Sequence, residues 1–116
     1  MTNKEIFKKL NRIGYIPYLY NTVEKLKFLD IKSKDFSIEF NLIVYWFNEK
    51  YNLYSCISLF DCIDRNDLSK SIYKYKVDVT RTVEKENSIC KITTYHSDFY
   101  NARLNCILKL LEMVGE

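Results

Sequence analysis

One histidine is the side chain in this sequence best suited to exchange protons near neutral pH. His96 is the only histidine among the 116 residues, and Asp98 lies two positions later. Imidazole titrates close to neutrality, so a histidine beside a carboxylate or a cysteine thiolate could act as a general base. No second histidine and no motif for a cysteine–histidine pair accompanies it. This pattern favours a surface histidine at a strand-to-helix junction over a catalytic base.

A short acidic segment is the only candidate for binding a hard cation. It contains Asp61, Asp64, Asn66 and Asp67. Several oxygen ligands on one loop can bind calcium or magnesium, but this loop lacks the glycine and the distal glutamate of an EF-hand. Aspartate and asparagine are also typical of turns, where they bond to nearby backbone. We therefore expect a turn here, and no metal site.

Other enzymatic signatures are also missing from the sequence. The only glycines are Gly14 and Gly115, so no glycine-rich phosphate loop can form. Paired carboxylates exist on the outer face of the first predicted strand and elsewhere, but nothing in the sequence shows that they converge. We expect a protein that is not an enzyme and that holds no cofactor.

Four cysteines are spread along the chain: Cys56, Cys62, Cys90 and Cys106. Their spacing matches no zinc pattern. No hydrophobic signal segment is visible at the start of the sequence, and no apolar run approaches the ~20 residues of a membrane span. Free cysteine usually behaves as a small buried hydrophobe. The sequence thus predicts four free thiols in the core and a cytoplasmic protein.

The segment Lys70–Lys76 alternates basic and aromatic residues. On a strand, Lys70, Lys74 and Lys76 would share one face, while the tyrosines would occupy the other. A nucleic-acid surface needs rings and cations on the same face. The alternation therefore favours a solvated lysine face and a buried tyrosine face, and a lysine-protected edge strand would have the same pattern.

Tyrosine is abundant, with ten copies. A domain of this size cannot bury and satisfy so many hydroxyl groups, and tyrosine is common at protein interfaces. The tyrosines that we expect near a protein-binding surface are Tyr15, Tyr18, Tyr20 and Tyr51.

Two helices are predicted at the start of the chain. Thr2 and Glu5 form a capping box, an apolar stripe follows, and Gly14 can end the first helix in a left-handed conformation. Pro17 can begin a second helix, which continues to Leu29 at helical spacing.

Alternating apolar residues then predict four strands, at residues 36–47, 53–60, 71–79 and 83–95. Short polar links join them, so the sheet should be an antiparallel meander. Ser97 is expected to cap a last helix that reaches Val114 and is apolar over most of its circumference. Residues 1–116 thus predict one α+β domain in the order α-α-β-β-β-β-α, with the last helix packed on the sheet.

The segment from Asp98 to Glu112 resembles the closing helix of small phage proteins with an α-β-α sandwich domain. The resemblance rests on Ala102 followed by Leu104, Cys106, Leu108 and Lys109. It implies a helix after an antiparallel sheet and carries over no functional residues.

Together these features predict a small non-enzymatic protein of phage or mobile-element type. It would bind and inhibit a protein partner, such as a host defence enzyme (as an anti-CRISPR protein does) or a toxin (as an immunity protein does). The alternative is a nucleic-acid-binding module or a small RNase-like toxin that uses Lys70–Lys76, for which the net charge of +3 is suitable. We expect no membrane partner, and a monomer or a small homo-oligomer.

Overall fold

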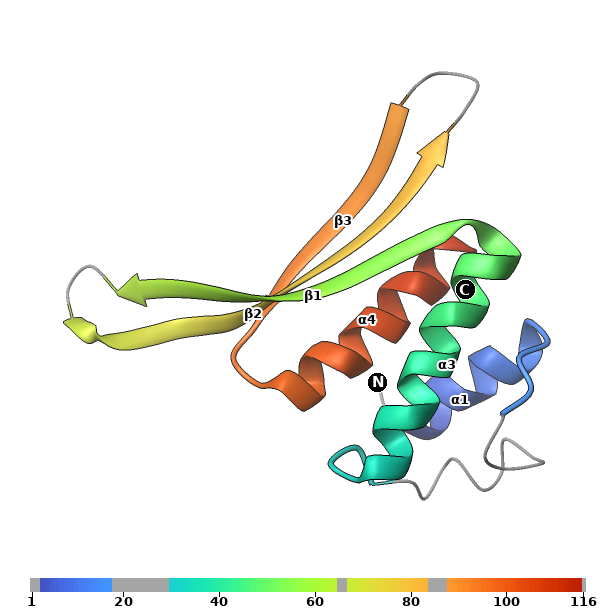
Figure 1. The fold of residues 1–116 in the computed structure, drawn as a ribbon, viewed down its shortest axis with the longest axis horizontal. Coiled ribbons are helices and arrows are strands. Elements are labelled where there is room, and N and C mark those ends of the chain that lie inside the picture. The colour runs from blue at the N-terminus through green and yellow to red at the C-terminus, as the bar shows by residue number, and fades with distance from the viewer. Residues whose placement is uncertain (1–2, 18–29, 65–66, 84–87, 116) are drawn as a thin grey trace.

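The computed structural model describes residues 3–17, 30–64, 67–83 and 88–115. Its elements, in chain order, are the helices α1 (Asn3–Arg12) and α3 (Lys34–Tyr51), the strands β1 (Leu53–Asp64), β2 (Asp67–Val83) and β3 (Ser88–His96), and the helix α4 (Phe99–Met113). These described helices lie on one side of the sheet (Figure 1). The α+β class predicted from the sequence is confirmed.

The described sheet has three antiparallel strands in the order β1-β2-β3, which confirms the meander for the last three predicted strands. β1 and β2 are longer than expected, because their pairing continues past a register shift after Leu59 to the pair Asp64 and Asp67. The interruption predicted at residues 61–66 is therefore wrong, since Asp61 and Asp64 belong to β1. The extended β1–β2 hairpin projects away from the helices (Figure 1), so Leu59 is 84% exposed.

The first predicted strand, residues 36–47, is instead the helix α3. The alternation of apolar and polar residues at positions 36–42 fits a strand, while the spacing of the buried Phe36, Phe40, Ile43 and Phe47 fits one face of a helix. The ends of the segment decide between them. The Ser33 hydroxyl accepts a hydrogen bond from the Phe36 backbone N–H at 3.1 Å, and Asn52 ends the helix with φ = 57°.

α1 and its ending agree with the sequence pattern. Ile6, Phe7 and Leu10 are buried. Gly14 has φ = +94°, and the next residue, Tyr15, donates its backbone N–H to the carbonyl oxygen of Leu10 at 3.0 Å. The predicted second helix, from Pro17 to Leu29, lies outside the described residues beyond Pro17 itself.

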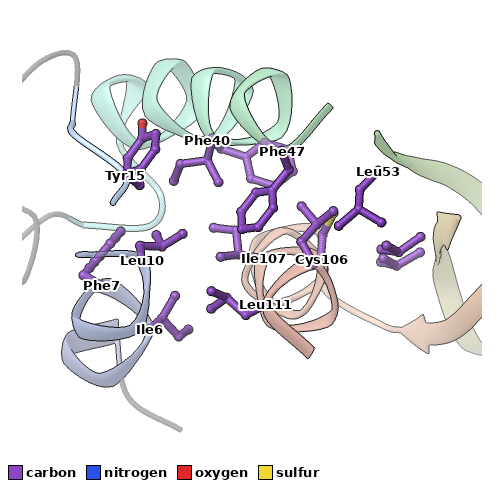
Figure 2. Packing of buried hydrophobic residues seen from close by; sticks show 14 of the residues in the cluster. Ile6, Phe7, Leu10, Tyr15, Phe40, Phe47, Leu53, Cys106, Ile107 and Leu111 are labelled. Carbon is purple, nitrogen blue, oxygen red and sulfur yellow. The ribbon is translucent and has the colours of Figure 1, made fainter. Parts of the chain in front are cut away.

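α4 is the central helix, as predicted, and lies between the sheet and α1. Its cap is Asp98, one residue later than expected: the Asp98 carboxylate, not Ser97, accepts from the Asn101 backbone N–H at 3.2 Å. Figure 2 shows Ile107 and Leu111 of this helix facing α1, and Cys106 beside Leu53 toward the strands. Two of the sheet's inner residues, Val77 and Val79, complete this core.

The helices of the described segments include none that is long and apolar enough to span a bilayer.

Candidate binding surface

The sheet has an inner face against α4 and an outer face that no described helix covers (Figure 1). Val77 and Val79 on β2 are fully buried on the inner side, so the residues between and beside them point outward. The strand register extends this assignment to the neighbouring strands. We define the outer face by the following residues: Tyr54, Cys56, Ser58, Lys74, Lys76, Asp78, Thr80, Lys91, Thr93 and Tyr95.

Cations and rings share this outer face. Tyr54 is 53% exposed and Tyr95 is 42% exposed. Tyr95 stands directly opposite Lys76 on the neighbouring strand, while Tyr54 and Lys91 flank Thr80 from its two sides. The tyrosines of the outer face come from β1 and β3 and not from β2. The alternation of lysine and tyrosine along β2 puts them on opposite faces of that strand, but the tyrosines of the neighbouring strands still lie on the same face as the β2 lysines.

One carboxylate lies at the centre of the outer face. Asp78 Oδ1 is 3.5 Å from Lys91 Nζ and accepts a hydrogen bond from Thr93 Oγ1 at 2.7 Å, and its Oδ2 is 3.8 Å from Lys76 Nζ. Partial burial alone would raise the pKa of Asp78. The Thr93 hydrogen bond and the two lysines outweigh that effect and hold the pKa below its ordinary value.

The structure describes the side chains of two of the three lysines predicted to contact nucleic acid. Lys74 is exposed and Lys76 is half-buried, both on the outer face. Lys70 is in β2, and its side chain lies outside the described residues. On the inner side, Tyr75 is half-buried and its ring centroid is 5.3 Å from that of Phe99, which agrees with the predicted tyrosine face.

The predicted tyrosine surface does not form as expected. Tyr15 is 3% exposed and donates its hydroxyl hydrogen to the buried carboxylate of Glu39 on α3. Burial, the hydrogen bond and the negative charge of Glu39 all raise the pKa of Tyr15. Tyr51 is half-buried against Trp46, and Tyr18 and Tyr20 lie outside the described residues. The expectation that Tyr15 is at the surface was wrong because Glu39 supplies a buried acceptor.

His96 is held in a polar chain on the inner side of the sheet. Its Nε2 lies 2.9 Å from Thr94 Oγ1, which in turn donates to Asn105 Oδ1 of α4 at 2.7 Å. Since the Thr94 hydroxyl donates to Asn105, it accepts from His96, which places a proton on Nε2. The histidine thus joins β3 to α4 at the strand-to-helix junction.

The described cysteines are free thiols with opposite environments. Cys106 is buried, and burial raises the pKa of its thiol to about 11. Cys56 is exposed on the outer face, so its predicted place in the core is wrong. The side chains of Cys62, Cys90, Asp61, Asp64 and Asp67 lie outside the described residues, as does Asn66. Within the described part, no three acidic, histidine or cysteine residues gather into a metal-binding group.

Sequence reasoning missed one residue completely. Arg103 on α4 is 5% exposed, and its guanidinium lies among aromatic rings. The spacing from Phe99 and Tyr100 to Arg103 is that of neighbours on a helix surface, so this signal could have indicated the contact. Two further rings beside the guanidinium, those of Phe36 and Phe40, come from α3 and could not be anticipated from spacing within α4.

Comparison of the chain with protein-family models, with curated proteins and with solved structures finds no match in any of the three.

Proposed function

We propose that this chain is a non-enzymatic binding module that holds single-stranded nucleic acid against the outer face of its sheet. The main support is that two exposed tyrosines, Tyr54 and Tyr95, share this face with Lys74, Lys76 and Lys91. Aromatic rings are stacking platforms for bases, and lysines neutralise the phosphates between them. This combination is what the segment Lys70–Lys76 lacks when it is considered alone.

The spacing on the face suits an extended strand of nucleotides. Tyr95 and Lys76 are cross-strand partners, so their Cβ atoms are about 5 Å apart, and a base on the ring leaves its phosphate near the ammonium group. A second ring and cation, Tyr54 and Lys91, lie on either side of Thr80 and are therefore two strand spacings, or about 10 Å, apart. Two ring–cation pairs on one exposed face give room for more than one nucleotide.

The test is the salt dependence of binding to a labelled oligothymidylate, followed by fluorescence anisotropy. If three lysines contact phosphates, the logarithm of the binding constant should fall against the logarithm of salt with a slope of about −2, from about 0.7 per contact. Replacing Lys74, Lys76 and Lys91 together with glutamine should flatten this slope and weaken binding by more than about tenfold.

A matched control removes the same charge from the helical side. Lys4, Lys8 and Lys34 are exposed on α1 and α3, and their replacement by glutamine should leave binding within about twofold of wild type. Equal loss in both triple variants would mean that net charge alone drives binding, and a flat slope for the wild-type protein would reject the proposal.

A second candidate function is inhibition of a protein partner, which one observation favours. Ile38 is 47% exposed and Tyr45 is 63% exposed on the same side of α3, seven residues apart. An apolar helix stripe of this kind can dock into a groove of another protein. In a phage or mobile element, the partner would be a host defence enzyme or a toxin. Both described cysteines are free, which supports the cytoplasmic location that such an inhibitor needs.

The two candidates use different surfaces, so one capture experiment separates them. A partner bound through α3 should be lost by the double variant Ile38→Ser, Tyr45→Ser and retained by Tyr54→Ala, Tyr95→Ala. The reverse pattern, or capture that neither variant changes, would count against a role for α3.

A further inference from the structure

A buried guanidinium lies between the first turns of α3 and α4. Arg103 is 5% exposed, and four rings surround its Cζ atom. The distances from Cζ to the ring centroids are 4.7 Å for Phe99, 5.4 Å for Phe36, 5.5 Å for Tyr100 and 5.8 Å for Phe40. Ring faces attract a guanidinium, but they accept no conventional hydrogen bond from its N–H groups.

The hydrogen-bond inventory of Arg103 is incomplete. A guanidinium has five N–H donors. In the described part of the chain, one acceptor is present, Ser37 Oγ at 2.6 Å from Nη1, and Nε has no partner. No carboxylate of the described residues lies within ion-pair distance of this group. Buried, uncompensated donors are costly, by about 1–3 kcal/mol each for neutral groups and more for charged ones.

One edge of the guanidinium makes no hydrogen bond to the described residues. Ser37 accepts from one N–H of Nη1, and the edge formed by the buried Nε and by Nη2 has no acceptor among them. Such an edge binds the two oxygens of a carboxylate or a phosphate through parallel hydrogen bonds. Ser37 therefore holds the guanidinium in an orientation in which no described residue accepts a hydrogen bond from its oxyanion-binding edge.

A second cation lies beside the same cluster of rings, because Lys32 Nζ is 5.7 Å from the Tyr100 ring centroid. The carboxylates of Asp98 and Asp30 accept backbone N–H groups, from Asn101 and Lys32 respectively. Both helices also begin here, and helix N-termini carry partial positive charge.

We propose that Arg103, positioned by Ser37 and assisted by Lys32, binds an oxyanion, the phosphate or the carboxylate of a small ligand. The ligand would enter past Phe99, which is 39% exposed, and the half-buried Tyr100, because Phe36 and Phe40 are buried. This site lies on the helical side of the sheet. It is separate from the outer face and does not depend on nucleic-acid binding.

The test is an NMR titration of the full chain labelled with ¹⁵N, which resolves the side-chain Nε–H of a protected arginine. Sodium phosphate and sodium acetate are added separately, and sodium chloride at matched ionic strength is the reference. We expect the Arg103 Nε–H resonance to shift and saturate with phosphate or acetate, and the anion with the lower saturation point identifies the ligand class. The melting temperature should rise with the same anion, since the folded state binds it.

Variants assign the response to this site. Arg103→Lys removes the reporting resonance, so this variant is followed by its melting temperature: phosphate or acetate should no longer raise it above the value in chloride, because a lysine cannot offer two parallel donors. Ser37→Ala should weaken binding about tenfold, because Nη1 then loses its acceptor and competes for the anion's position. Arg81→Lys, on the inner side of the sheet, is the matched control and should leave the titration unchanged.

Two results would overturn the proposal. The first is no saturable shift of the Arg103 resonance with either anion, or the same shift with chloride. The second is an unchanged titration in Ser37→Ala. Both measurements stand even if Arg103→Lys fails to fold, because neither of them uses that variant.

Discussion

The outer face of the sheet and the helical layer behind it contain the same kinds of reactive group in contrasting environments. Each has a cation, a carboxylate and a thiol: Lys91, Asp78 and Cys56 outside, and Arg103, Glu39 and Cys106 inside. Outside, the lysine and the carboxylate pair directly, 3.5 Å apart, with water access. Inside, the carboxylate accepts from a phenol and the cation lies among rings.

This contrast shows which charges are available to a ligand. An exposed ion pair contributes about 0–1 kcal/mol, so a polyanion can displace Asp78 from its lysines at little cost. A buried group has to be satisfied within the protein or by a ligand. The charged groups of the outer face can therefore exchange an ion pair for a bound polyanion at little cost. The buried groups of the helical layer stabilise the fold or, as proposed for Arg103, bind a specific anion.

The largest difference between the two regions should appear when each cation is removed. Arg103→Ala leaves a space among four rings and should lower the free energy of unfolding by about 3 kcal/mol. Lys91→Ala, with its side chain 48% exposed, should change it by less than about 0.5 kcal/mol. Urea denaturation of both variants measures the difference. Equal effects would show that the rings around Arg103 contribute no stability.

The two thiols, Cys56 and Cys106, should differ strongly in their rates of alkylation. Burial raises the pKa of Cys106 to about 11 from an ordinary 9.0, so at pH 8 its thiolate fraction is about a hundredfold below that of an ordinary thiol. Cys56 is exposed and should be alkylated by iodoacetamide more than a hundredfold faster. Peptide mapping by mass spectrometry after timed pulses distinguishes the sites. Similar rates would place Cys106 at the surface and contradict the described core.

The third difference is the direction of the pH dependence. The pKa of Tyr15 lies above its ordinary value of 10.0, so above that pH the unfolded chain releases a proton that the folded chain keeps. Stability should therefore fall as the pH rises past about 10. The pKa of Asp78 lies below its ordinary value of 3.8, so its contribution is present above that pH and is lost as the pH falls.

Tyr15→Phe tests the alkaline side of this contrast. It leaves Glu39 without the phenol donor, so it should lower stability by about 2 kcal/mol at neutral pH and flatten the loss above pH 10. Thermal unfolding between neutral and alkaline pH measures both effects. If the stability of the variant falls above pH 10 as steeply as that of the wild type, the pKa of Tyr15 does not differ between the folded and the unfolded state.

A small change in stability, with the most informative functional effect, should come from Asp78→Asn. The exposed ion pairs contribute little, so the free energy of unfolding should change by less than about 1 kcal/mol. Removing the negative charge frees Lys76 and Lys91 for phosphates, so affinity for oligothymidylate should rise several-fold. Unchanged or weaker binding would indicate that these two lysines do not face the ligand.

The contrast between β2 and α3 explains how far the sequence predicted the fold. In β2 polar and apolar residues alternate from Tyr73 to Thr80, so one secondary structure fits there, and the strand predicted at residues 71–79 was confirmed as part of β2. In α3 the alternation at residues 36–42 fits a strand while Phe36, Phe40, Ile43 and Phe47 have the spacing of a helix face, so periodicity could not distinguish the two. The decisive signals were Ser33 and Asn52, the residues at its two ends.

The candidate surface was harder to predict than the fold. Lys74 and Lys76 were identified from β2 alone, but their ring partners come from β1 and β3, and cross-strand register does not follow from one strand's pattern. Arg103 was missed because a basic residue in an amphipathic helix usually faces water. Its environment depends on Phe36 and Phe40 from another helix, which no local spacing reveals.

The central claim is that the outer face of the sheet binds single-stranded nucleic acid. The most direct test is to add unlabelled oligothymidylate to the ¹⁵N-labelled protein and map the backbone amide shifts. The largest changes should occur at Tyr54, Lys74, Lys76, Lys91 and Tyr95. Changes centred on Ile38 and Tyr45 of α3, or no saturable change at all, would contradict the claim.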